Sequence, residues 1–186
     1  KKEKPLKAST PKTKAEKLAQ KIWQENGASV PVDVYAIASA HRIGIKTESM
    51  EDDVSGMMVT SEAGVASILI NASHAAVRQK FSTAHELGHY FLHRSTSPVF
   101  VDSKNGAQVF FRDGKAATGT HYQEIEANAF AAELLMPETE IRKIFPQKIS
   151  GMELDYFEDE IEKVARDWKV SKSALTIRLN RLGITD

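Results

Sequence analysis

The sequence contains no cysteine, and this absence narrows the chemistry that the chain can carry. Without thiols there are no disulfides and no thiolate metal ligands, so a metal site must be built from histidine and carboxylate side chains. The chain also has no apolar run long enough to cross a bilayer, and no apolar segment follows its Lys-rich start as a signal peptide would require. We therefore expect a cytoplasmic protein with no membrane partner.

The chain also has no net charge, but its charged residues are unevenly distributed along the sequence. The 25 basic and 25 acidic residues cancel, whereas residues 1–21 hold eight Lys and two Glu and carry about +6. No aromatic residue that could stack on a nucleic-acid base occurs between Lys1 and Ile22. We predict a flexible basic tail over residues 1–12 rather than a nucleic-acid-binding arm.

The spacing of apolar residues predicts an α+β fold that is mainly helical with a small antiparallel sheet. Strands are expected over 43–47, 55–60 and 65–71, the last two as a hairpin. Helices are expected over 13–27, 32–41, 75–93, 123–136, 139–145, 154–168 and 172–182. We divide the chain into one domain over residues 13–150 and a C-terminal helical region over residues 151–186.

Residues 94–120 form a long segment without a strong helical pattern. Two short apolar patches, Pro98–Val101 and Gln108–Phe111, are expected to pair as a hairpin. Connections of this length are uncommon unless they have a function, so the segment is a candidate lid or docking strand.

The run His85-Glu86-Leu87-Gly88-His89 has the form H-E-x-x-H, which on a helix indicates a zinc-activated water. Two histidines four residues apart lie on one helix face and can bind one metal, while Glu86 is rotated by about 100° and is placed to act as general base. Apolar residues at helical spacing around the motif, such as Phe81, Ala84 and Tyr90–Leu92, predict that this helix packs in a core.

A catalytic zinc usually has three protein ligands, so a third residue must complete the pair His85 and His89. His93 would lie about 12 Å along the helix from His85, which is too far for both to bind one ion. The stronger candidate is Glu126, which stands among small alanines that would let its helix approach the motif helix closely. Glu124 and Glu133 are expected either to face solvent or to hydrogen-bond to the metal ligands without binding the metal themselves.

The same residues resemble the ImmA/IrrE family of zinc metallopeptidases, which are gluzincin-like proteases associated with helix-turn-helix repressors. The resemblance covers three blocks, Val54–Met58, Ile70–Asn71 with Arg78–His93, and Glu126–Pro137. It implies a zincin-like fold, zinc ligands at His85, His89 and Glu126, and Glu86 as the general base. It also implies a site-specific endopeptidase that cleaves a helix-turn-helix transcriptional repressor and so relieves repression of stress-response or mobile-element genes.

The C-terminal residues 165–175 have a helix-turn-helix cadence that also recurs in this family. Lys172, Arg178 and Arg181 supply some positive charge for DNA, but Lys169 stands where such a turn commonly has glycine. Structural or substrate-docking roles are favoured over DNA contact. The alternative function is a non-proteolytic, zinc-stabilised regulator that binds a repressor or DNA through these helices.

The residues leave several points open. Manganese or iron could occupy the same ligands as zinc. The oxyanion of the reaction needs a stabilising group, for which the chemically able side chains are His121, Tyr122 and Tyr156. The repressor, the bond cleaved, the activating signal and the oligomeric state do not follow from the sequence.

Overall fold

The computed structural model describes residues 12–60, 65–94, 99–103, 117–149 and 154–185. For residues 60, 99–103, 117–120 and 154–156 it describes the backbone only. The chain begins with two helices, α1 (Lys14–Glu25) and α2 (Val34–Ala40). Three strands follow, then the long helix α3, a fourth strand and four more helices. Their bounds are β1 (Gly44–Glu48), β2 (Val54–Thr60), β3 (Ala66–Asn71), α3 (Ala76–His93), β4 (Val99–Ser103), α4 (Ala117–Leu135), α5 (Glu138–Ile144), α6 (Leu154–Trp168) and α7 (Lys172–Arg181).

The α+β fold class expected from the sequence is confirmed, with one correction to the sheet. The strand order is β1-β3-β2-β4, and β1 runs parallel to β3 while the other two pairings are antiparallel. The sheet is therefore mixed rather than antiparallel, because β1 adds to the outer side of the β2–β3 pair in the direction of β3. The patch that begins at Pro98 supplies β4, which pairs with β2; the patch Gln108–Phe111 lies outside the described residues, so the hairpin between the two patches stays a prediction.

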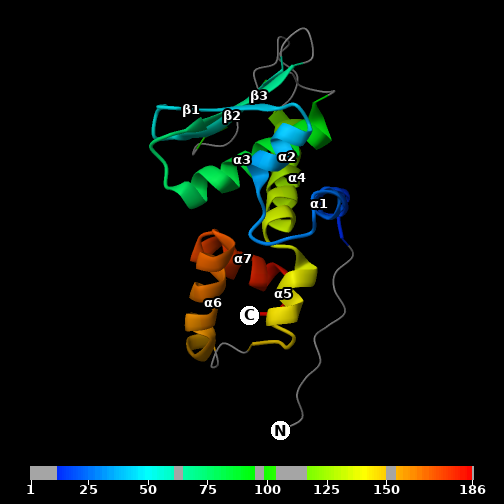
Figure 1. The fold of residues 1–186 in the computed structure, drawn as a ribbon, viewed down its shortest axis with the longest axis vertical. Helices are drawn as coiled ribbons and strands as arrows, with labels where there is room; N and C mark the ends of the chain where they lie inside the picture. The colour runs from blue at the N-terminus through cyan, green and yellow to red at the C-terminus, as the bar shows by residue number, and fades with distance from the viewer. Residues whose placement is uncertain (1–11, 61–64, 95–98, 104–116, 150–153, 186) are drawn as a thin grey trace.

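Helix α3 packs against the sheet through β2 and β3, and α4 packs against α3. The inward side chains Met58, Ile68 and Ile70 of the sheet are fully buried, as are Leu87 of α3 and Phe130 of α4. Figure 1 shows the sheet at one end of the molecule, α5, α6 and α7 at the other, and α4 running between them. The sheet on one side and α4 on the other thus enclose the motif helix α3 in the core, as its apolar spacing predicted.

The two C-terminal helices are joined by a short turn at Lys169–Ser171. Lys169 has φ +54°, the left-handed conformation in which glycine avoids a cost of roughly 1–2 kcal/mol. Val170 N–H donates to the Ala165 carbonyl at the end of α6, and the Ser171 hydroxyl accepts from Ala174 N–H and caps α7. The turn therefore has the backbone of a glycine-containing turn with a lysine in the glycine position.

Helix α7 is joined to α4 by a buried ion pair between Arg178 and Glu133, which are 2% and 0% exposed. Arg178 also donates to the Met136 carbonyl (3.3 Å), and Lys12 contacts Glu133 from the other end of the chain. Lys12, expected in the flexible tail, is thus held at the protein surface. One of the three basic residues considered for DNA contact is therefore inside the molecule, and the helix-turn-helix function of α6 and α7 stays a prediction. None of the described helices combines the length and apolar character that a bilayer crossing requires.

Candidate metal centre

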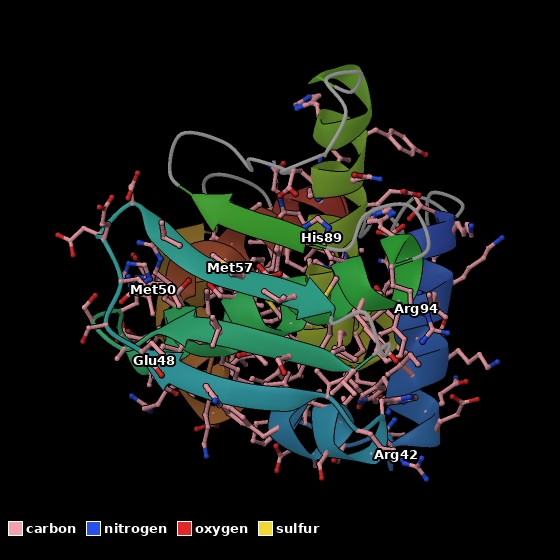
Figure 2. The ribbon with its side chains drawn as sticks, turned by 90° about the horizontal axis from the view of Figure 1, so that it is seen from above. Arg42, Glu48, Met50, Met57, His89 and Arg94 are labelled. Atoms are coloured by element: carbon pink, nitrogen blue, oxygen red, sulfur yellow. The ribbon has the colours of Figure 1, made fainter. Side chains whose placement is uncertain are left out.

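Helix α3 brings the two motif histidines together in the core. His85 and His89 are 2% and 1% exposed, and their Nε2 atoms lie 3.0 Å apart because residues four apart share one helix face. Figure 2, which looks down on the sheet, shows His89 on the side of the sheet where β4 lies. The histidine pair therefore has the arrangement that the H-E-x-x-H spacing predicts.

Glu124 of α4 is the carboxylate that faces this pair. One of its oxygens lies 3.1 Å from His85 Nε2 and the other lies 2.9 Å from His89 Nε2. These three side chains form a group that could hold a metal ion, identified among the described residues. The distances between the two Nε2 atoms and from each Nε2 to the carboxylate are 2.9–3.1 Å. They are close to the spacing of roughly 3.3 Å between ligand atoms of a tetrahedral zinc with bonds of 2.0–2.1 Å.

Glu126, the third ligand expected from the sequence, lies elsewhere. Its carboxylate is 3.6 Å from Nε2 of His93, one turn beyond His89 on α3. Two residues along a helix turn through about 200°, so Glu124 and Glu126 cannot present their carboxylates in the same direction. The structure thus places together His85, His89 and Glu124, and leaves Glu126 beside His93.

A sequence signal for Glu124 existed in the spacing of its own helix. Ala127 of α4 lies against Gly88 of α3, since a Cβ added at Gly88 would meet Ala127 Cα at 3.1 Å and Ala127 O at 3.2 Å. Glu124 is three residues before Ala127 and four before Asn128, so these residues lie on one face of α4. Of the alanines around Glu126, Ala127 contacts α3, and it lies on the helix face of Glu124.

Asn128 fixes the orientation of one histidine. The Nδ1–H of His85 donates to the side-chain carbonyl of Asn128 at 3.1 Å, since an amide oxygen only accepts. This hydrogen bond places the proton of a neutral His85 on Nδ1 and leaves the lone pair of Nε2 directed at His89 and Glu124. Asn128 therefore orients the ring of His85 so that Nε2 can bind a metal ion.

Glu86 is fully buried, at 0% exposure, and strand β2 covers it. Gly56 of β2 makes this possible, since a Cβ at this position would lie 3.4 Å from Oε1 of Glu86 and 3.1 Å from a methyl group of Ile70. Gly56 belonged to a block of family resemblance, but no spacing argument connected it with Glu86. Its role depends on a contact between strand and helix that only the fold reveals.

Charge states in the group suit a cation. Burial lowers the pKa of His89 to about 4, assisted by the neighbouring imidazoles and opposed by Glu124. Burial raises the pKa of Glu124, but its close contacts with His85 and His89 outweigh burial and bring the value to about 2. At neutral pH His89 is therefore neutral and Glu124 is ionised, which are the forms that bind metals.

The remaining candidates are distributed around this group. His93 is buried and its ring lies 5.6 Å from that of His89, while Glu133 is committed to Arg178. His121 and Tyr122 are exposed on α4, and nothing is described of the Tyr156 side chain. The oxyanion-stabilising group expected among these three therefore stays a prediction.

Comparison with known proteins places the chain in a protein family. Residues 38–180 match the family model described as IrrE N-terminal-like domain, Peptidase M78. The chain belongs to this family. The matched residues contain the motif helix, Glu124, Asn128 and Gly56, so this IrrE N-terminal-like domain holds the entire candidate metal centre.

A solved structure supports the fold of the domain. A Mycobacterium tuberculosis transcriptional regulator is similar with a TM-score of 0.56 and 14% sequence identity, over 89% of this chain. The chain spans 46% of the length of that protein. No match was found among curated proteins. The chain is therefore a domain of a peptidase family, and three of its residues, described above, could hold a metal ion.

Proposed function

We propose that this IrrE N-terminal-like domain is a zinc-dependent endopeptidase, with His85, His89 and Glu124 holding the ion. One observation carries the proposal: two imidazole nitrogens and a carboxylate meet within 2.9–3.1 Å of one another, and the buried Glu86 follows His85 on the same helix. A carboxylate and two imidazoles suit zinc, although manganese and iron accept the same ligands.

The bound ion would supply Lewis acidity to the scissile carbonyl and to the attacking water. The chain supplies the rest of the reaction. Glu86 accepts the proton of the attacking water on its carboxylate and then donates it to the leaving amine. Gly56 lets the sheet lie directly over Glu86, which keeps bulk water from this carboxylate, and Asn128 holds the ring of His85.

The substrate that we propose is a helix-turn-helix transcriptional repressor, which the family resemblance of the sequence implies. Cleavage would relieve repression of stress-response or mobile-element genes. A structural zinc has no use for an acid next to its ligands, so Glu86 argues against the alternative of a non-proteolytic regulator.

The metal site is tested by the metal content of the purified protein and of three variants. We expect one zinc per chain in the wild type, and loss of zinc in His85→Ala and Glu124→Ala. Glu126→Ala is the matched control, because it removes the same carboxylate two residues along the same helix, and it should retain zinc. Zinc retained in Glu124→Ala and lost in Glu126→Ala would refute our choice of third ligand.

The activity is tested by cleavage of a purified helix-turn-helix repressor, with Glu86→Gln as the decisive variant. This change keeps the shape of the side chain and the three ligands but removes the base, so cleavage should fall about 10²- to 10⁴-fold while zinc stays bound. Repressor release in cells that survives Glu86→Gln with zinc still bound would establish the non-proteolytic alternative instead.

A further inference from the structure

A second site is formed on the other side of the motif helix by a cleft between α2, α3 and α6. The cleft has a volume of about 610 Å³ and is lined by residues 31–35, by Ala76, Val77 and Lys80 of α3, and by Ala165, Arg166 and Lys169 at the end of α6. Lys80 precedes His85 by five residues, which places it about 140° around the helix from that ligand. In Figure 1 the end of α6 that leads into α7 lies below the first half of α3.

Lys80 is the unusual residue of this cleft, because its side chain is buried at 8% exposure. Its Nζ donates to the Trp168 carbonyl at 2.8 Å. An ammonium group carries three N–H donors, so two remain for a further acceptor. Lysine is rarely buried unless it is paired, and a carbonyl compensates only part of its charge.

The charges around Lys80 favour an anion. Arg166 and Lys169 line the cleft at its exposed side, and neither is in an ion pair with another residue of the described part of the chain. Among the described residues, Asp33 is the one acidic residue that lines the cleft, and its carboxylate accepts the N–H groups of Tyr35 and Ala36, so three basic residues face one acidic residue there. Lys169 occupies its position in a backbone conformation that glycine would adopt with less strain.

The remaining walls are apolar. Pro31, Val32, Val34 and Tyr35 come from the segment that enters α2, and Ala76 and Val77 come from the uncapped first turn of α3. A cleft of several hundred Å³ with apolar walls and a few convergent polar groups is typical of small-molecule sites. The first turn of a helix also favours negative charge nearby.

We propose that this cleft binds a small organic anion, with its carboxylate or phosphate group on Lys80, Arg166 and Lys169 and its apolar body against Val32, Val34 and Val77. Such a ligand would join the motif helix to the C-terminal helices. The site is independent of the proposed proteolysis, because none of these residues belongs to the metal group.

The probe for the test is 8-anilinonaphthalene-1-sulfonate, whose fluorescence reports binding of an aromatic anion in an apolar site. We expect saturable binding of one probe per chain, about tenfold weaker in Lys80→Met. Lys169→Gly should weaken binding roughly two- to fivefold and cannot harm the fold through its backbone, because glycine suits φ +54°. Lys163→Met is the matched control, an exposed lysine of α6 away from the cleft, and should bind as the wild type does.

Competition identifies the anionic group. Displacement of the probe by benzoate or by phenyl phosphate supports the site, and the tighter competitor identifies a carboxylate or a phosphate ligand. Displacement by inorganic phosphate as strong as that by phenyl phosphate contradicts a role for the apolar walls. Equal binding by the wild type, Lys80→Met and Lys169→Gly, or binding that does not saturate, overturns the proposal. The zinc content of the same samples reports the metal centre separately.

Discussion

The residue Lys80 shows how folding changes the chemistry of a single side chain. Burial and, to a smaller extent, the positive charge of Lys169 lower the pKa of Lys80 to about 8, against the opposing effect of Asp33. Arg166 is the other charged residue that lines the same cleft. The folded protein therefore holds the Lys80 proton less tightly than the unfolded chain does.

This difference predicts that stability rises with pH in a defined range. Between the folded pKa of about 8 and the ordinary value of 10.5, the unfolded chain binds the proton and the folded protein does not, so higher pH favours the folded state. Urea unfolding at pH 7.5 and pH 10 should show a gain of about 1 to 3 kcal/mol in the wild type relative to Lys80→Met. The comparison removes titrations that both proteins share, and an equal pH response of the two would contradict the prediction.

At the scale of elements, the contact between α3 and α4 positions the metal centre. Gly88 of α3 lies against Ala127 and Phe130 of α4, and a Cβ there would meet both within 3.1–3.2 Å. His85 and His89 flank Gly88 on one helix, and Glu124 and Asn128 flank Ala127 on the other. The distance between the two helices therefore decides whether the carboxylate reaches the imidazoles.

Gly88→Ala is expected to separate the two helices. Overpacking costs about 1–3 kcal/mol, and the better helix propensity of alanine returns about 1 kcal/mol, so a net loss of up to about 2 kcal/mol is expected. The zinc content should fall as Glu124 moves away. Gly44→Ala is the control, because its Cβ would meet only Ser67 Oγ at 3.4 Å. Zinc retained at the wild-type level in Gly88→Ala would show that the helices accommodate the methyl group.

For the molecule as a whole, Glu133 connects the two ends of the described chain to its centre. This fully buried carboxylate of α4 contacts Lys12 ahead of α1 and Arg178 of α7. Burial raises the pKa of Glu133, while the two cations act to lower it. Helix α7 is thus joined by a buried ion pair to the helix that carries Glu124.

Removing the arginine should therefore loosen the whole C-terminal region. Arg178→Met leaves Glu133 buried with Lys12 as its remaining cationic partner, so unfolding should become easier by about 3 kcal/mol, the lower part of the range for breaking a buried pair. Hydrogen exchange of α6 and α7 should increase in the same variant. Arg181→Met, on the exposed side of α7, should change stability by less than about 0.5 kcal/mol. Similar losses in both variants would show that the buried pair is not what holds α7.

The sequence predicted the features that depend on local spacing. The motif helix, the pairing of His85 with His89, the bounds of α6 and the cap at Ser171 follow from periodicity and capping chemistry. The carboxylate that lies beside the histidines does not follow from local spacing, because Glu124 and Glu126 are both near small residues and only Glu124 shares the helix face that packs against Gly88. The parallel pairing of β1 and the cover of Glu86 by Gly56 depend on contacts between elements, which no local pattern encodes.

The ion pair between Glu133 and Arg178 also has a consequence for the order in which the protein is made. Glu133 is 45 residues ahead of Arg178, so α4 leaves the ribosome before the helix that neutralises its buried carboxylate. Until α7 has emerged, burying this face of α4 leaves Glu133 without its arginine. We expect α3 and α4 to reach their final packing, and the candidate metal centre its final geometry, only after translation has passed α7.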